Sequence, residues 1–466
     1  MPVVLCVPAE ARRVPENLKR VMTLRKTLFL VDGEHHPPTV LEAVRELEER
    51  EGLHPVGLFF LGGTEKVPNP SVLQGPDWEL VVAEDAFREL GGALRRLRPD
   101  VVVDLSDLPV LGPAERLSLA AVSLAHGVPY RGADFEFRPP RREEVLSKPS
   151  CAVIGTGKRC GKTAVSAEMA GWLAASGHRP VVVAMGRGGP AQPYVVDGQG
   201  ITVDFLLSEL DKGLHAASDH YEDAMVSGVV TVGSRRCGGG MAGEPFVTNC
   251  VEAAKVANRL PGDAVILEGS GSSIPPVASG TTLCVVSAAQ DLDESLGYLG
   301  PYRLLISDGV VITMAEEPFA SPRKIEELRE RIKRINGEIS IIETVFRPHP
   351  LKPIGGRKVF LAVTASEVSG GLLKEHLEKE EGCRVVGMSF HLADRERLRG
   401  DLVEAEGAEV LLTELKAAAV DVITRFAGET GREVVYFHNR PVPVGGRGEL
   451  EDLFGKLWEL ARERSP

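Results

Sequence analysis

The sequence predicts an α/β protein made of three successive α/β blocks, and two features of the chain support that prediction. Short apolar runs rich in β-branched residues end in Gly or Asp, and stretches with helical spacing lie between them. The runs are continuously apolar, which is typical of strands in a parallel sheet that helices cover on both faces. With 466 residues, the chain is long enough for several domains.

The first block is expected at residues 23–140, after an N-terminal extension of residues 1–22. Its clearest elements are strands TLFLVDG (27–33), PVGLFFLGG (55–63) and PDVVVDLSD (99–107), and a helix at 40–51. Residues 138–149, RPPRREEVLSKP, are rich in proline and charge and are interpreted as a linker.

The second block is expected at residues 141–350. A strand at 151–155 leads into a helix at 161–176. Segment 203–225, rich in Asp, Glu and His, is interpreted mainly as helix with an exposed loop. Further strands are expected at 180–186, 228–233, 263–269, 282–288 and 303–315.

The third block is expected at residues 351–466. It contains KVFLAVTAS (358–366), RVVGMSF (384–390), AEVLLTELKAAAVDVITRFA (408–427) and EVVYFHN (433–439), with a closing helix near 449–463. No sequence repeat or low-complexity tract is visible, so a solenoid or a disordered chain is not indicated.

Composition excludes several classes of function. The net charge is −12, which argues against broad nucleic-acid binding. No apolar run approaches the roughly 18 residues of a membrane span, and the N-terminus does not read as a secretion signal. The cysteines form no CxxC pair, which predicts neither a zinc site nor a disulfide framework and is consistent with a cytoplasmic protein. They are Cys6, Cys151, Cys160, Cys237, Cys250, Cys284 and Cys383.

The stretch GTGKRCGKT (155–163) stands between a predicted strand and a predicted helix. Free backbone N–H groups at a helix N-terminus bind anions, and a following GKT supplies a lysine for phosphates and a hydroxyl for Mg²⁺. Thr156 occupies the position where the usual phosphate-loop pattern has glycine, and the alternative is a glycine-rich turn. We predict a P-loop NTPase-like middle block. The predicted nucleotide-binding residues are Gly157, Lys158, Arg159, Cys160, Gly161, Lys162, Thr163 and Ala164.

A magnesium site beside a phosphate loop needs an acidic residue at the end of a neighbouring strand. Glu268, in DAVILEGSGSSIPP, satisfies this requirement and is predicted to hold Mg²⁺ together with Thr163. The alternative is a solvated acid at a strand end. Asp197, Asp204 and Asp263 are weaker candidates because acids are common in loops.

Two further glycine-rich loops carry arginines. MGRGGP (185–190) contains Arg187, and SRRCGGGMAGEP (234–245) contains Arg235 and Arg236. Arginine forks bind phosphate in a bidentate manner, and ligands gather at the carboxyl ends of parallel strands. We therefore predict a second polyanion site next to the phosphate loop. The alternative for each loop is a flexible surface segment with solvated arginines.

Three other polar segments are left open between a site and ordinary surface charge. Segment 203–225 offers a general base among Asp219, His220 and Glu222, while His215 and His220 have poor spacing for a metal pair. The others are VDGEHHPP (31–38), with Asp32, Glu34, His35 and His36, and TELKAAAVDV, with Glu414, Lys416 and Asp421.

Taken together and in order, these motifs resemble the cyclic 2,3-diphosphoglycerate synthetase family. The resemblance is carried by VDGEHHPP, GTGKRCGKT, MGRGGP, SRRCGGGMAG, LEGSGSSIPP and TELKAAAVDV, and it extends from about Thr23 to the end. The phosphate-loop block alone is also similar to dethiobiotin synthetase, whose loop has threonine at the position of Thr156. That similarity supports Lys162, Thr163 and Glu268 as nucleotide and metal residues.

The resemblance implies an ATP- and Mg²⁺-dependent ligase. Such an enzyme converts 2,3-diphosphoglycerate to cyclic 2,3-diphosphoglycerate through a pyrophosphoryl intermediate and releases ADP and phosphate. The expected catalytic residues are Lys162, Arg187, Arg235 and Arg236. A homodimer is the default oligomer. The alternatives are another P-loop small-molecule kinase or ATP-dependent ligase, and a nucleotide-regulated ATPase switch.

Overall fold

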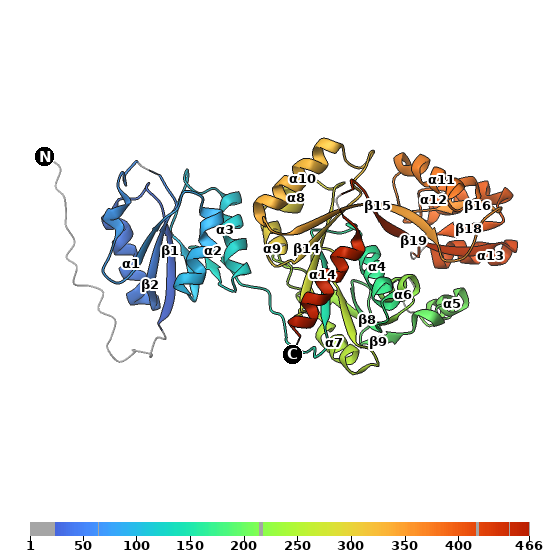
Figure 1. Cartoon of the computed structure of the whole chain (residues 1–466), viewed down its shortest axis with the longest axis horizontal. Helices are drawn as coiled ribbons and strands as arrows, with labels where there is room; N and C mark the ends of the chain where they lie inside the picture. Colours follow the sequence, from blue (N-terminus) through green and yellow to red (C-terminus); the bar gives the residue numbers. More distant parts are fainter. Residues whose placement is uncertain (1–23, 64, 214–217, 416–418, 447, 466) are drawn as a thin grey trace. The chain divides into compact units, whose positions relative to one another are not determined.

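The computed structural model describes residues 24–63, 65–213, 218–415, 419–446 and 448–465, and it divides the chain into two compact units. The first unit ends at Pro139 and the second begins at Pro140 (Figure 1). Each unit has its own sheet and its own apolar core. The mostly parallel α/β fold class expected from the sequence is confirmed, whereas the division into three blocks stays a prediction.

The first unit contains a six-stranded sheet in the order β3-β2-β1-β4-β5-β6. Neighbouring strands are parallel except β5 and β6, which are antiparallel. Continuous burial of β1 and β4 between helices explains their unbroken apolar sequences. The elements are β1 (Arg25–Val31), α1 (Pro37–Glu51), β2 (Leu53–Phe60), β3 (Glu79–Val82), α2 (Ala86–Leu97), β4 (Val101–Asp104), α3 (Pro113–Ala125), β5 (Tyr130–Arg131) and β6 (Glu136–Phe137).

The second unit contains a thirteen-stranded sheet. Its order is β11-β10-β8-β12-β7-β13-β14-β15-β19-β18-β16-β17, with β9 pairing to β10. The strands are β7 (Ser150–Gly155), β8 (Pro180–Gly186), β9 (Tyr194–Val196), β10 (Val230–Cys237), β11 (Val247–Thr248), β12 (Ala264–Glu268), β13 (Thr281–Ser287), β14 (Gly309–Thr313), β15 (Ser340–Pro350), β16 (Lys358–Ala362), β17 (Arg384–Ser389), β18 (Val410–Thr413) and β19 (Glu433–Pro443).

Helices connect and cover these strands (Figure 1). They are α4 (Lys162–Ala175), α5 (Val203–Asp211), α6 (Asp219–Ser227), α7 (Cys250–Arg259), α8 (Leu292–Leu296), α9 (Gly300–Leu305), α10 (Pro322–Ile335), α11 (Gly370–Lys379), α12 (Arg395–Asp401), α13 (Thr424–Thr430) and α14 (Leu450–Glu463). Among the described residues, no helix combines the length and apolar character that crossing a membrane requires.

The long strands β15 and β19 join two parallel sets of strands into one sheet. The first half of β15 pairs parallel with β14, and its second half pairs antiparallel with β19. The first residues of β19 pair parallel with β18. Because the sheet continues through this pair, the carboxyl ends of β7, β8 and β12 and those of β16 and β18 can contribute to one site.

One predicted strand is wrong at its start. The run 303–315 was expected to be a strand, but residues 303–305 complete α9 and only Gly309–Thr313 forms β14. A short apolar run fits a buried helix as well as a buried strand, so periodicity could not separate them. Arg303 is buried in this helix, and its guanidinium donates to the Ser272 carbonyl at 2.7 Å.

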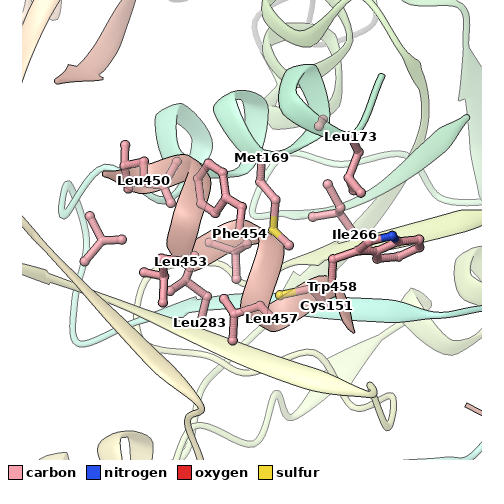
Figure 2. Close-up of a cluster of buried hydrophobic side chains, with 14 of the residues drawn as sticks. Cys151, Met169, Leu173, Ile266, Leu283, Leu450, Leu453, Phe454, Leu457 and Trp458 are labelled. Atoms are coloured by element: carbon pink, nitrogen blue, oxygen red, sulfur yellow. The ribbon is translucent and has the colours of Figure 1, made fainter. Parts of the chain in front are cut away.

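The closing helix α14 packs on the centre of the large sheet and not only on its own neighbours in sequence. Phe454 and Trp458 enter a core with Met169 of α4 and Cys151 of β7 (Figure 2). The Phe454 ring lies 6.1 Å from the Trp172 ring, centroid to centroid. This packing ties the end of the chain to the helix that follows the phosphate loop.

Candidate functional site

The glycine-rich loop lies between the carboxyl end of β7 and the N-terminus of α4, as the sequence predicted. Gly161 precedes the helix with φ of 92°, a conformation that favours glycine. A Cβ atom there would lie 2.2 Å from the Phe346 ring. The first turn of α4 therefore presents free backbone N–H groups at the sheet edge, which suits an anion.

Lys162 and Thr163 point to the mouth of this loop. The Lys162 ammonium donates to the Gly157 carbonyl at 3.0 Å and contacts the Cys160 sulfur at 3.5 Å. The Thr163 hydroxyl donates to Glu268 Oε1 at 2.7 Å. Glu268 ends β12, which pairs with β7, so the sheet brings the predicted metal residues into direct contact.

A cavity of about 870 Å³ opens in front of the loop. It is within the range of small-molecule sites and is large enough for more than one small ligand. Gly157 and Cys160 are absent from its described lining; Cys160 is fully buried beneath the loop. The predicted residues that line it are Lys158, Arg159, Gly161, Lys162, Thr163, Ala164, Arg187 and Glu268.

Two of the three predicted acceptor arginines lie together. Arg187 lines the cavity, and Arg236 donates to the Ser270 carbonyl at 2.8 Å. A Cβ atom on Gly271 would lie 2.8 Å from Arg187 Nη2 and 3.1 Å from Arg236 Nη2. Burial, and then the charge of Arg187, lower the pKa of Arg236. The pair therefore forms a positively charged spot beside the end of β12.

Neither Arg235 nor Arg236 is among the described residues that line the cavity. Arg235 is exposed, and its backbone N–H donates to Asn249 Oδ1 at 2.7 Å. Arg235 and Arg236 are consecutive residues of β10, and consecutive strand residues face opposite sides of a sheet. The two arginines could not be distinguished in the sequence, but in a strand only one of them can face a given side of the sheet. The catalytic role predicted for Arg235 stays a prediction.

The segment before β10 contributes acids. Asp219 and Glu222 of α6 line the cavity, whereas His220 is buried with Nδ1 2.9 Å from Ser218 Oγ. The sequence prediction missed Asp223, which is buried on the same helix. Burial, and then the neighbouring Glu268 carboxylate, raise the pKa of Asp223 well above its ordinary value. His215 lies outside the described residues.

The far wall of the cavity comes from strand ends in residues 364–439, and sequence reasoning mostly missed it. Glu414, which was left open, accepts from the Thr364 hydroxyl at 2.7 Å and from Asn439 Nδ2 at 3.0 Å. Thr364 lies after β16, Glu414 after β18 and Asn439 within β19. These positions could have predicted a site, since ligands bind at the carboxyl ends of parallel strands. Lys416 lies outside the described residues, and Asp421 pairs with Arg395 at 2.6 Å.

The three weaker acidic candidates are absent from the described lining of the cavity. Asp263 accepts from the Arg179 N–H at 2.7 Å, and Asp197 accepts from the Gln199 N–H at 3.1 Å. Asp204 lies in the first turn of α5.

In the first unit, VDGEHHPP forms a strand-end turn. Asp32 is fully buried and accepts from the backbone N–H of Glu34 at 3.0 Å and of Asp107 at 2.6 Å. It also pairs with His35 Nδ1 at 2.8 Å. His36 precedes α1 and is exposed. The Asp32 carboxylate therefore has its hydrogen-bond partners within the first unit.

Comparison with known proteins identifies the family. Three family models match in succession: the N-terminal domain of cyclic 2,3-diphosphoglycerate synthetase at residues 26–138, its P-loop domain at 150–345 and its C-terminal domain at 350–440. A protein of that name from Rubrobacter xylanophilus is 49% identical over 94% of this chain and 97% of its own length. The relative from Methanothermobacter thermautotrophicus is 47% identical over 93% and 96%.

The chain belongs to the cyclic 2,3-diphosphoglycerate synthetase family. The resemblance drawn from the ordered motifs is thereby confirmed. In this synthetase-family chain, the cavity draws its phosphate loop, Arg187 and Glu268 from the region matched by the P-loop domain. Its far wall, with Thr364, Glu414 and Asn439, comes from the region matched by the C-terminal domain.

Proposed function

We propose that this chain uses ATP to close 2,3-diphosphoglycerate into cyclic 2,3-diphosphoglycerate, releasing ADP and phosphate. The supporting observation is the single cavity that collects the phosphate-loop cations, Glu268 and Arg187 on one side of the large sheet. An acceptor with two phosphates and a carboxylate needs such a concentration of positive charge next to a triphosphate.

In this proposal the phosphate loop holds ATP. The N–H groups at the start of α4 and the side chains of Lys158 and Arg159 face the triphosphate. The Lys162 ammonium moves from the Gly157 carbonyl, which it contacts at 3.0 Å, to the β- and γ-phosphate oxygens. The exchange replaces a hydrogen bond to a neutral carbonyl with hydrogen bonds to negatively charged oxygens.

Thr163 and Glu268 fit a magnesium ion. Both offer oxygen ligands, which Mg²⁺ prefers, and the buried Oε2 of Glu268 has no hydrogen-bond partner among the described residues. An ion bound there would neutralise part of the phosphate charge. Thr163 and Glu268 would then exchange their mutual hydrogen bond, 2.7 Å in this structure, for the ion.

In this proposal the acceptor, 2,3-diphosphoglycerate, binds at Arg187 and Arg236. Guanidinium groups match phosphate oxygens in a bidentate way, and the partial burial of Arg236 strengthens such contacts. Arg235 was predicted to share this role and is tested alongside them below. The arginines would hold the acceptor phosphates while leaving one of their oxygens free to attack.

The reaction needs two displacements. An oxygen of one acceptor phosphate attacks the γ-phosphorus of ATP, the bond to the β-phosphate oxygen breaks, and ADP leaves. An oxygen of the second acceptor phosphate then attacks the first phosphorus, and inorganic phosphate leaves as the ring P–O–P bond forms. Holding the two phosphates together can lower such a barrier by roughly 7–11 kcal/mol at best.

The test is phosphorus NMR of the purified chain incubated with ATP, magnesium and 2,3-diphosphoglycerate. We expect cyclic product and ADP in equal amounts. Lys162→Ala should lower the rate by roughly 100-fold or more, as loss of one transition-state donor does elsewhere. Lys255→Ala, on the exposed side of α7, is the charge-matched control. Wild-type chain without product, or Lys162→Ala at the control's rate, would contradict the proposal.

We also propose that the enzyme acts in the cytoplasm as a homodimer, as expected from the sequence. Cell fractionation tests the first statement and sedimentation equilibrium the second. A membrane-bound fraction or a monomer at enzymatic concentrations would contradict them.

A further inference from the structure

The far wall of the cavity carries an acid that the proposed mechanism does not use. Glu414 directly follows β18, is 8% exposed and lines the cavity. Thr364 donates to its Oε2 twice, from the hydroxyl at 2.7 Å and from the backbone N–H at 3.3 Å. Asn439 Nδ2 donates to its Oε1 at 3.0 Å. A carboxylate has about four acceptor sites, so Oε1 has room for one more donor, from a ligand.

The two substrates of the proposed reaction differ in what they offer to such an acid. In 2,3-diphosphoglycerate both hydroxyls are esterified, so the molecule has two phosphates and a carboxylate but no alcohol group to donate. Its negative charges are repelled by a carboxylate in the wall. ATP has an uncharged half, adenosine, whose ribose hydroxyls are hydrogen-bond donors. An acid at Glu414 therefore suits the nucleoside and not the acceptor.

The rest of this wall also suits an uncharged group. Two arginines line it, and each is paired with an acid: Arg347 with Glu316 at 2.6 Å and Arg395 with Asp421 at 2.6 Å. Apolar and aromatic side chains with a few polar groups are typical of pockets for such ligands. The apolar residues on this side of the cavity are Phe346, Leu372, Leu373 and Phe437.

Strand β15 links this wall to the phosphate loop. Phe346 lies against the loop, since a Cβ atom on Gly161 would lie 2.2 Å from its ring. Two residues later, Pro348 pairs with Asn439 of β19, and Asn439 donates to Glu414. Two residues of a strand span about 7 Å. A nucleotide whose phosphates occupy the loop therefore has its ribose within a short distance of this wall.

We propose that Glu414 binds the ribose of ATP: its Oε1 accepts a hydrogen bond from a ribose hydroxyl. This inference rests on the proposed nucleotide site and assigns the nucleoside to the region matched by the C-terminal domain. An acid after a parallel strand binds a ribose hydroxyl in dinucleotide-binding folds as well. Thr364 and Asn439 are positioning residues, because they hold the Glu414 carboxylate in place for this contact.

The experiment measures the binding of three probes to the full chain by isothermal titration calorimetry with Mg²⁺. The probes are ADP, 2′,3′-dideoxy-ADP, which lacks only the ribose hydroxyls, and inorganic pyrophosphate, which lacks the adenosine. We expect the wild type to bind ADP about 10-fold more tightly than 2′,3′-dideoxy-ADP, the equivalent of one hydrogen bond to a charged group. Glu414→Gln should lose most of this preference and should bind pyrophosphate as the wild type does.

Glu409→Gln is the matched control, since Glu409 is exposed just before the opposite end of β18. The substitution removes the same charge beside the same strand, and all three probes should bind as they do to the wild type. Glu414→Asp is a second variant in case Glu414→Gln does not fold. It keeps the charge but withdraws the carboxylate by one carbon, so it should also lose most of the preference for ADP over 2′,3′-dideoxy-ADP.

The outcomes separate the two proposals. Equal affinity of the wild type for ADP and 2′,3′-dideoxy-ADP, or an unchanged preference in a folded Glu414→Gln chain, would overturn the role of Glu414. So would an equal loss of affinity for all three probes, because that is the behaviour of a residue that only supports the fold. In each case the proposed function stands if the wild type forms cyclic product. A wild type that binds neither ADP nor pyrophosphate would overturn both.

Discussion

At the scale of single residues, the neighbours Arg235 and Arg236 show what backbone geometry adds to a motif. Arg236 is half-buried beside Arg187 and the Ser270 carbonyl, whereas Arg235 is exposed. A doublet of identical side chains in a strand is a natural comparison because the change in charge and size is the same.

We predict that Arg236→Ala raises the KM for 2,3-diphosphoglycerate by roughly 10- to 100-fold, the equivalent of one charge-assisted phosphate contact. Its KM for ATP should change much less. Arg235→Ala should have a smaller effect on both. Steady-state kinetics with each substrate varied in turn measures this, and equal effects of the two substitutions would contradict the acceptor site described above.

The position of the predicted phosphate loop could be inferred for a local reason. Lys162 and Thr163 follow a strand and open a helix, so the order of residues along the chain alone places them at a helix N-terminus. Glu268 was predictable because its strand is continuously apolar and ends in a polar turn. Asp223 was not, because an acid within a polar helical segment carries no sign of burial until the helix packs.

At the scale of elements, β19 places a partly buried histidine, His438, in the cavity wall. Burial, and then the charges of His349 and Arg440, lower the pKa of His438 to about 4. Its Nδ1 is buried without a hydrogen-bond partner among the described residues, and its ring meets the His349 ring edge-on. Between about pH 4 and pH 6.5, His438 is therefore neutral in the folded chain and protonated in the unfolded chain.

This shift predicts a loss of stability in mild acid. Between the ordinary histidine value of about 6.5 and the folded value, the unfolded state binds the extra proton, so the free energy of unfolding falls as the pH falls. The contribution of His438 is fully present above about pH 6.5 and would decline by roughly 2–3 kcal/mol towards pH 4.

Urea unfolding of ligand-free protein at several pH values from 7.5 to 4.5 measures this. His438→Gln should show a flatter dependence than the wild type, and His36→Gln, at an exposed position, should not. Identical pH dependences of the free energy of unfolding for wild type and His438→Gln would rule out a lowered pKa of His438 in the folded chain.

Most strands and helices could be predicted from their sequences, and the failures have a common cause. The strand β8 has the predicted bounds of 180–186, and α14 lies within a residue of its expected limits. The run at 303–315 failed because a helix end and a strand are both continuously apolar when buried. The packing of α14 against α4 and β7 could not be predicted from its amphipathic pattern. Such a pattern shows that a helix has an apolar face but not which element covers that face.

At the scale of the whole molecule, the first unit has what an independent domain needs. It contains a complete six-stranded sheet, and its core includes Phe29, Leu58, Phe60 and Val101, all buried. Compact units with their own cores usually fold alone.

We predict that residues 24–139 expressed alone fold cooperatively, with a sharp thermal transition in circular dichroism and protected amides in hydrogen exchange. The complementary chain from residue 140 onward should bind Mn²⁺ with ADP as the full chain does, since the residues assigned to that site lie in it. A fragment 24–139 without a cooperative transition would contradict this division.

The sequence by itself determined the α/β class, the phosphate loop and the family, because these depend on local order: apolar runs, glycine spacing and the succession of motifs along the chain. Only the tertiary structure decided that, of two adjacent arginines, Arg236 lies beside Arg187, that Asp223 lies beside Glu268, and that strand ends from residues 364–439 contribute to the cavity wall. The first of these features depends on strand alternation, the second on the packing of α6 against the sheet, and the third on pairing between β15 and β19. Such pairing brings together residues distant in sequence, and no local pattern encodes it.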